Sequence, residues 1–431
     1  MKQTVWKSRI SSPQRGLAIE VLRKLATKFQ DSNNCLKGIA SARSQSEYFH
    51  WHDYHYAHFA MFFCELDRLL PGEGYFVLAH RYLLKAIEAS KECFGISMFE
   101  GTTGIGMAAQ LLHERFPRYA SLLSSIDHVI NKHCASLLID IRCSKSIPEE
   151  SFDLISGLSG IARYFICRAN AGVAQPQLAP LLQVLIDLSA IDGQGIPEYK
   201  TKPQDLVGSL SNYKFGLVNL GLAHGIAGPL TIMSLAIESK LEIPMLKIAT
   251  KRLVQFFVDN ISEDEFGLGW PGLLPLNEEQ QIAYGGGELG SSWCYGSASI
   301  AQAVGRAVNA VETPEFVSVT TAATSAAVRR SLKNNDLHSL TLCHGKAGLF
   351  LNLLHAFNDG ACEYEIESAR IVFDDLLNGF DADTAFGFQN NEKGTCIDDP
   401  KFLSGSIGIG LVLIAAMQDT EPLWDRMLLL K

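Results

Sequence analysis

Apolar residues recur along the chain in a pattern typical of paired helices. Seven runs carry apolar residues at helical spacing with polar residues between them, as expected for helices with one buried face. Six further runs alternate with these and are apolar and rich in glycine on every side, which is typical of helices enclosed by protein. Strand patterns are scarce. The seven one-faced helices are expected at residues 17–29, 75–92, 118–137, 178–188, 244–258, 316–332 and 364–377.

The six enclosed runs begin with a shared motif, a glycine usually followed three positions later by a second small residue. Small residues at the start of a helix allow its neighbours to approach closely. Residues 54–70 fit as a seventh enclosed helix that lacks the motif. The first motif glycines of the six runs are Gly101, Gly157, Gly225, Gly296, Gly345 and Gly405.

Repeated helix pairs bury a core only by stacking on their neighbours. Because the enclosed helices are apolar all round, a closed ring explains the pattern better than an open solenoid does. The sequence therefore predicts an all-α fold, an α/α toroid of about seven inner and seven outer helices. We expect one domain over residues 1–431, with recognisable repeats over about 98–417.

A ring would gather the glycine turns at one mouth, and the repeats differ most at that place. The reactive or polar side chains of the turns would then converge. They are Glu100, Asp153, His224, Trp293, Cys294, Tyr295, Cys343, His344 and Ser404.

Cys294, Cys343 and His344 lie at equivalent positions of two repeats. Two thiolates and one imidazole form a suitable ligand set for a catalytic zinc ion, whose fourth position stays open for water or substrate. We therefore expect zinc at these residues. The alternative is that both cysteines are small packing residues at crowded helix starts.

His224 precedes a turn glycine and is a candidate acid or base, because imidazole titrates near neutral pH. Its alternative is a buried histidine bonded to backbone. Asp153 is a candidate partner of His224 or a proton donor, and its alternative is a plain helix N-cap. Trp293 and Tyr295 flank Cys294, either as walls of a substrate pocket or as core aromatics.

The stretch HWHDYHYAH places His52, His55 and His58 three residues apart. This spacing drifts around a helix, so we expect a polar, partly exposed helix face rather than a metal site. Two long loops, residues 191–215 and 262–292, lead into the third and fourth repeats. We place these loops around the mouth, where they either guide an extended peptide or serve as ordinary surface connections.

Composition and charge narrow the class of protein. The 431-residue chain has a formal net charge of −9, which argues against a nucleic-acid partner. The N-terminal sequence MKQTVWKSRISSPQRG lacks the apolar core of a signal peptide. The most apolar stretch, residues 215–237, contains Asn219, His224 and Pro229, so no transmembrane segment is expected. Ten cysteines without a CxxC pair fit a reducing compartment, and we expect a cytoplasmic protein.

Three motifs, LGLAHGIAGPL, SSWCYG and LCHGKAGL, occur in this order, and DLISGLSGI precedes them. Together they resemble the lanthionine synthetase C-like cyclases of lanthipeptide biosynthesis. The resemblance covers the repeats and implies an α/α toroid, in agreement with the predicted ring. By position, the resemblance implies that Cys294, Cys343 and His344 correspond to the family's zinc ligands. It implies that His224 and Asp153 correspond to the active-site His and Asp. Trp293 and Tyr295 correspond to the aromatic residues beside the first cysteine.

The chain departs from the family pattern at Gly290, where the family commonly has an arginine three residues before the tryptophan. The resemblance implies a zinc-dependent cyclase that adds peptide Cys thiolates to dehydroalanine or dehydrobutyrine. The products are lanthionine and methyllanthionine. The implied partners are a dehydrated precursor peptide, a separate dehydratase and an ABC exporter beside which a cytoplasmic cyclase would work.

Three other functions fit parts of the pattern. The same residues could add a small thiol such as glutathione to dehydrated peptides. A non-catalytic scaffold that binds peptides is favoured only by Gly290. A zinc prenyltransferase-like enzyme also activates a thiolate in an α/α toroid, but it needs a basic diphosphate pocket, and the turn motifs contain no Arg or Lys cluster.

Overall fold

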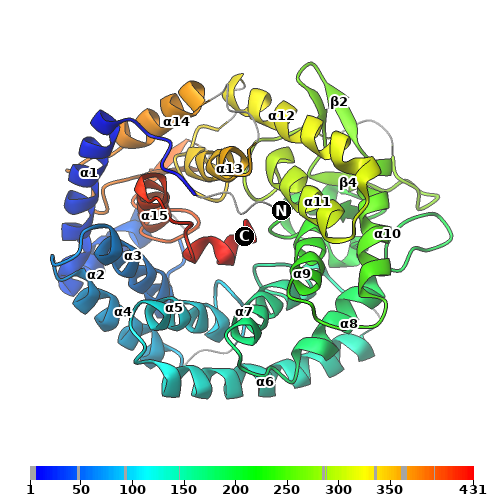
Figure 1. Ribbon diagram of the computed structural model, residues 1–431, viewed down its shortest axis with the longest axis horizontal. Helices are drawn as coiled ribbons and strands as arrows, with labels where there is room; N and C mark the ends of the chain where they lie inside the picture. The colour runs from blue at the N-terminus through cyan, green and yellow to red at the C-terminus, as the bar shows by residue number, and fades with distance from the viewer. Residues whose placement is uncertain are drawn as a thin grey trace.

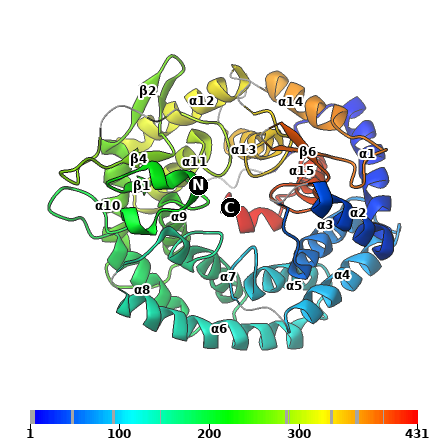
Figure 2. The same cartoon turned by 180° about the vertical axis from the view of Figure 1, so that it is seen from behind.

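The computed structural model describes residues 6–45, 49–91, 95–144, 146–283, 287, 289–333, 337–360, 366–392 and 394–431. Within these residues there are fifteen α-helices and three two-stranded ribbons. The helices form a closed ring (Figure 1). The ring has an inner and an outer layer, and seen from behind it shows the same two layers (Figure 2). The predicted α/α toroid is thereby confirmed.

The inner layer holds the apolar helices that follow the glycine turns. These helices have almost no exposed side, and all twelve residues of α15 are buried. The segment without the glycine motif is the inner helix α3, as expected. The inner helices are α3 (Tyr56–Leu69), α5 (Thr102–Arg115), α7 (Leu158–Asn170), α9 (Ala227–Glu238), α11 (Ser297–Ala310), α13 (Lys346–Asn358) and α15 (Ser406–Met417).

The outer helices bury one face each, because their apolar residues recur at three- and four-residue spacing. In Figure 1, α1 lies outside α15 and next to α14, so the first helix covers the last inner helix and closes the ring. The outer helices are α1 (Ser12–Gln30), α2 (Ser32–Gln45), α4 (Tyr75–Ala89), α6 (Ala120–Cys143), α8 (Leu178–Leu188), α10 (Leu246–Asp259), α12 (Val317–Lys333) and α14 (Ile366–Asn378).

The helix α2 was not expected from the sequence. Its buried residues include Cys35, Gly38, Ile39 and Ala42, three of them small, so its apolar pattern is faint. The other outer helices match their predicted ranges, with the largest differences at α1, which begins five residues earlier, and α6, which ends six residues later than predicted. Residue 92 and residues 361–365 lie outside the described residues.

Three short antiparallel ribbons interrupt the helices. β1 (Leu217–Asn219) pairs with β4 (Leu273–Pro275), β2 (Ser262–Asp264) with β3 (Gly267–Gly269), and β5 (Asn390–Glu392) with β6 (Thr395–Ile397). Their strands have three residues each, which is too short for a clear period-two pattern. The short 3-10 helices are Asp53–His55, Glu149–Ser151, Pro203–Asp205, Gly208–Asn212, Pro314–Phe316 and Trp424–Leu428.

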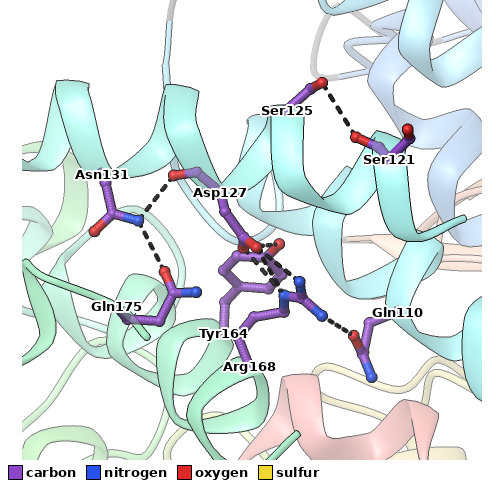
Figure 3. Close-up of polar contacts among 8 residues, drawn as sticks. All are labelled: Gln110, Ser121, Ser125, Asp127, Asn131, Tyr164, Arg168 and Gln175. Atoms are coloured by element: carbon purple, nitrogen blue, oxygen red, sulfur yellow. Dashed lines mark hydrogen bonds and ion pairs between the residues drawn. The ribbon is translucent and has the colours of Figure 1, made fainter. Parts of the chain in front are cut away.

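A buried polar network fixes the two layers against each other (Figure 3). The Asp127 carboxylate of α6 accepts a 2.7 Å hydrogen bond from the Tyr164 hydroxyl of α7 and pairs with Arg168 at 2.7 Å. Arg168 also donates to Gln110 of α5 at 2.8 Å. Because a buried charge is costly unless it is paired, this network holds α5, α6 and α7 in one register.

Backbone hydrogen bonds link the six glycine turns one to the next around the mouth. Glycine is required here because the chain folds back closely: a Cβ on Gly157 would lie 2.6 Å from the Asp153 nitrogen, and one on Gly225 would lie 2.5 Å from the Asn219 oxygen. Each of the first five turns donates a backbone amide to a carbonyl of the next turn. The five bonds are Phe99 to Ile155 (3.4 Å), Leu154 to Ala223 (3.0 Å), Leu222 to Cys294 (2.9 Å), Cys294 to Cys343 (3.2 Å) and Cys343 to Leu403 (2.9 Å).

The C-terminal segment lies within the ring, near its centre (Figure 1). Arg163 of α7 donates to the Lys431 carbonyl at 2.7 Å, and the Trp293 indole donates to the Leu428 carbonyl at 3.2 Å. These bonds tie the segment to α7 and to the turn before α11. Within the described parts of the chain, none of the helices has the length and hydropathy needed to cross a bilayer.

Candidate functional site

The thiols of Cys294 and Cys343 lie together at the mouth. Each stands in the turn before an inner helix, α11 or α13, and the Cys294 amide donates to the Cys343 carbonyl at 3.2 Å. The hydrogen bond from Cys343 lowers the pKa of the Cys294 thiol to about 7, against an opposing effect of burial. The Ser292 hydroxyl and the His224 ring contribute in the same direction. The Cys294 thiol is therefore readily deprotonated near neutral pH.

His344 follows Cys343 directly, and its side chain is exposed. Over the residues that the structure describes, no group of three or more His, Cys, Asp or Glu side chains is assembled in a way that could hold a metal ion. The structure thus brings the two thiols together, and His344 does not complete a set of three with them. The chemistry of the donors nevertheless fits a thiophilic metal, because the Cys294 thiol ionises readily, the Cys343 thiol lies beside it and an imidazole stands on the residue after Cys343.

Asp153 and His224 form a hydrogen-bonded pair across two neighbouring turns. The Asp153 side chain is fully buried, and one of its oxygens lies 2.6 Å from Nδ1 of His224. Its other oxygen accepts from the amides of Ser156 (2.8 Å) and Gly157 (2.7 Å) at the start of α7. Asp153 is thus not the N-cap of α7, which is Gly157; one Asp153 oxygen stabilises the turn before the helix and the other contacts the histidine.

The geometry determines which nitrogen of His224 is available. A carboxylate only accepts hydrogen bonds, so Nδ1 carries the proton toward Asp153 and Nε2 is left for other groups. Burial lowers the pKa of His224, but Asp153, Glu149 and Cys294 together outweigh this effect, and the net pKa is raised. The His224 side chain is 32% exposed, so a ligand can reach it.

Two buried residues of the site were missed in the sequence, Glu149 and Asn219. The Asn219 amide donates to the Glu149 carboxylate at 2.9 Å, and its oxygen accepts from the Gly221 amide at 3.0 Å. Burial raises the pKa of Glu149, and the Asn219 hydrogen bond and His224 oppose this rise. Asn219 stands just before the third repeat motif, which could have marked it, whereas no motif surrounds Glu149.

The two aromatic neighbours of Cys294 lie in different environments. Trp293 is fully buried, and its indole is bonded to Leu428, so it packs beneath the turn and offers no surface to a ligand. Tyr295 is partly exposed, and its ring stacks near His224 at a centroid distance of 6.2 Å. Burial raises the pKa of Tyr295, so its hydroxyl stays protonated. Tyr295 alone of this pair can face a substrate.

The second long loop, residues 262–292, packs against the site. Its strand β4 pairs with β1, which follows the first long loop, and the Leu220 amide donates to the Gly272 carbonyl at 2.8 Å. A Cβ on Gly272 would lie 3.0 Å from Cβ of Tyr295, so this loop packs directly on the tyrosine. A Cβ on Gly290 would meet no atom within 4 Å, so the position where the family commonly has arginine faces open space.

The expected exposed histidine face is wrong for two of its three residues. His52 is exposed, but His55 and His58 are 8% and 3% exposed. The reason is that α3 belongs to the inner layer, where Phe99 and Phe402 of neighbouring turns cover it.

Comparison with known proteins places this geometry in a family. The model of the lanthionine synthetase C-like proteins matches residues 56–429. The nisin biosynthesis protein NisC of Lactococcus lactis subsp. lactis is 23% identical over 317 residues, which are 71% of this chain and 73% of NisC. A solved structure of nisin cyclase superposes with a TM-score of 0.71 at 20% identity, over 87% of this chain and 90% of that one. The chain therefore belongs to the lanthionine synthetase C-like family.

Proposed function

We propose that the protein is a zinc-dependent lanthipeptide cyclase. The observation that carries the proposal is the convergence of two features at one mouth: a pair of thiols, of which Cys294 has a lowered pKa, and a histidine oriented by a buried aspartate. Membership of the family and the likeness to NisC support the same activity. The substrate class is then a peptide that a separate dehydratase has already modified.

Cys294, Cys343 and His344 are the residues that would hold the zinc ion. When bound, zinc with an open position lowers the pKa of a substrate thiol, which is otherwise about 8.5. The paired thiols suit this role because the Cys294 proton is lost near neutral pH. Two thiolate ligands would also keep the net charge of the site low, so that a substrate sulfur stays nucleophilic.

The proposed reaction is a net addition without a leaving group. The peptide thiolate forms a bond from sulfur to the β-carbon of a dehydroalanine or dehydrobutyrine. The carbon–carbon π bond breaks, and its electron pair moves onto Cα and the adjacent carbonyl. A proton then joins Cα, so the thioether product has the same composition as the dehydrated peptide.

His224 is the candidate proton donor for Cα. Its Nε2 is free of Asp153, and its raised pKa keeps a protonated fraction near neutral pH. Asp153 acts through the ring by fixing the tautomer and favouring the imidazolium. Tyr295 and the loop at Gly272 would bound the path of the peptide beside this histidine.

The test uses a synthetic peptide with a dehydroalanine and a cysteine several residues apart. Cyclisation leaves the mass unchanged but removes the free thiol, so mass spectrometry after alkylation counts uncyclised peptide. Wild-type protein with zinc should protect the thiol from alkylation, and Cys294→Ala should not. Cys143→Ala, an exposed cysteine at the end of α6, is the matched control and should behave as wild type. Equal protection by wild type and Cys294→Ala would overturn the proposal.

A further inference from the structure

A second side-chain bridge joins the two turns that carry Asp153 and His224. The Glu149 carboxylate, from the short 3-10 helix before Asp153, accepts a 2.9 Å hydrogen bond from the side-chain amide of Asn219, which ends β1 just before the His224 turn. The first bridge is the 2.6 Å contact between Asp153 and Nδ1 of His224. Two side-chain contacts therefore join the same two turns, and only one of them touches the histidine.

Asn219 closes the turn in which His224 stands. Its side-chain oxygen accepts from the Gly221 amide at 3.0 Å, and its backbone carbonyl accepts from the Ile226 amide at 2.8 Å. A Cβ on Gly225 would lie 2.5 Å from the Asn219 side-chain oxygen, so the turn is wrapped closely around this side chain. A shift of Asn219 would therefore move His224.

Glu149 is fixed to the Asp153 turn through its own backbone. Its carbonyl accepts from the amides of Phe152 at 3.1 Å and Asp153 at 2.9 Å. The residue as a whole is only 7% exposed. Since its backbone belongs to one turn and its carboxylate holds Asn219 of the next, Glu149 helps to set the position of His224 relative to Asp153.

The His224 turn is also attached to the thiol pair. The amides of Leu222 and Ala223 donate to the Cys294 carbonyl at 2.9 and 3.2 Å. A Cβ on Gly221 would lie 2.7 Å from the same carbonyl oxygen. The bridge from Glu149 to Asn219 therefore bears on how His224 stands relative to Cys294 as well.

The charge of Glu149 indicates more than a structural bridge. A buried carboxylate is costly unless a positive charge or hydrogen bonds compensate it. Of the groups that act most strongly on it, Asn219, Glu150 and Asp153 cannot carry a positive charge, whereas His224 can. A buried acid beside the candidate proton donor is typical of a functional site.

We propose that Glu149 and Asn219 are positioning residues for proton transfer by His224. Glu149 acts through Asn219, which holds the His224 turn so that Nε2 keeps one position relative to a peptide at Cys294 and Cys343. Neither Glu149 nor Asn219 needs to touch that peptide. The identity of the substrate rests on the proposed cyclase function, whereas the placement of His224 does not.

The test reverses the polarity of the bridge. Asn219→Asp keeps an acceptor for the Gly221 amide but sets a second carboxylate against Glu149, so the bridge should break. Adding Glu149→Gln to this variant supplies a new donor, and the hydrogen bond can form again in the opposite sense. Glu150→Gln, at the exposed acid next to Glu149, is the matched control.

The first readout is the rate of cyclisation. Asn219→Asp should lower kcat by about 10²-fold, the effect that a misplacement of about 1 Å can have, with little change in KM. The double variant should regain most of the lost rate, and Glu150→Gln should match wild type. A wild-type kcat in Asn219→Asp would overturn the proposal. A double variant as slow as Asn219→Asp alone would overturn it too.

The second readout is on His224 itself and needs no substrate. In protein labelled with ¹⁵N-histidine, the His224 ring signals are identified by their absence from His224→Gln and recorded at alkaline pH, where the ring is neutral. The signals should shift in Asn219→Asp and return in the double variant. Signals that respond to neither change would overturn the positioning role, even in an active enzyme. The expected shifts in a protein that does not cyclise the test peptide would support this role and count against the cyclase.

Discussion

On one side of the mouth, the buried polar groups are matched to one another, whereas on the other side they are not. Asp153 uses both oxygens, one on the α7 turn and one on His224, and Asn219 bridges Glu149 and the Gly221 amide. Across the mouth, His58 is equally buried, and neither of its nitrogens has a partner among the described residues.

The difference shows which side of the mouth is organised for chemistry. A fully bonded network holds His224 in one tautomer before any substrate arrives, which favours proton transfer. The His58 ring is instead packed against the rings of Phe99 and Phe402. We therefore assign the chemistry to the side of Cys294 and His224. The following changes test this assignment.

The largest effect is expected at the thiol pair. Cys343→Ala removes the partner that lowers the Cys294 pKa and one of the proposed zinc ligands. Cyclisation should fall to the uncatalysed rate, as counted by alkylation and mass spectrometry. Cys396→Ala, at an exposed cysteine on β6, is the control. Substantial activity in Cys343→Ala would mean that the pair only packs the turns.

His224→Ala should lose about 10²–10⁴-fold in the rate of cyclisation, the usual contribution of a positioned acid or base. Zinc content should stay as in wild type, because His224 is not among the proposed ligands. Metal analysis and the cyclisation rate are measured on the same sample. A wild-type rate in this variant would exclude His224 as the proton donor.

Asp153→Asn should change the protonation of His224 more than the fold. An asparagine oxygen can still accept from the amides of Ser156 and Gly157, but the charge that raises the His224 pKa is lost. NMR titration should show a His224 pKa above about 6.5 in wild type and a lower one in the variant. An unchanged value would contradict the assigned pairing.

The same variant should alter the dependence of stability on pH. Because the folded pKa of His224 is raised, the pair stabilises the fold fully below the unfolded value of about 6.5. This contribution is lost as the pH rises through the folded pKa. Denaturant unfolding at several pH values should therefore show the largest difference between wild type and Asp153→Asn at acidic pH.

The smallest effect is expected at Gly290. A side chain there meets no atom within 4 Å, so Gly290→Arg should change the free energy of unfolding by less than about 0.5 kcal/mol. Cyclisation should be unchanged or faster. A large loss of stability in urea unfolding would show that the loop has been built around glycine.

Much of the architecture could be predicted because it is encoded by local patterns. Glycine turns and all-round apolar helices predicted the inner layer, including α3, and one-faced helices predicted most of the outer layer. The exceptions have physical reasons: the buried face of α2 is small, and the strands of the ribbons have three residues each.

The candidate site was only partly predictable. The turn motifs indicated Asp153, His224 and the cysteines, because the repeats place them at equivalent positions. Glu149 enters the site through a side-chain contact with Asn219 from a distant turn, which no local pattern records. The burial of His58 depends on the rings of Phe99 and Phe402. These residues belong to two turns that come close to His58 only when the ring closes.

The most direct test of the account is the zinc content of the purified, untagged protein, measured by elemental mass spectrometry. His344 is the decisive residue, because the structure brings the two thiols together without it. We predict about one zinc ion per chain in wild type and in His338→Ala, an exposed neighbour on the same segment. The content should fall sharply in Cys294→Ala and His344→Ala. Absence of zinc from the wild-type protein, even after reconstitution, would contradict the account.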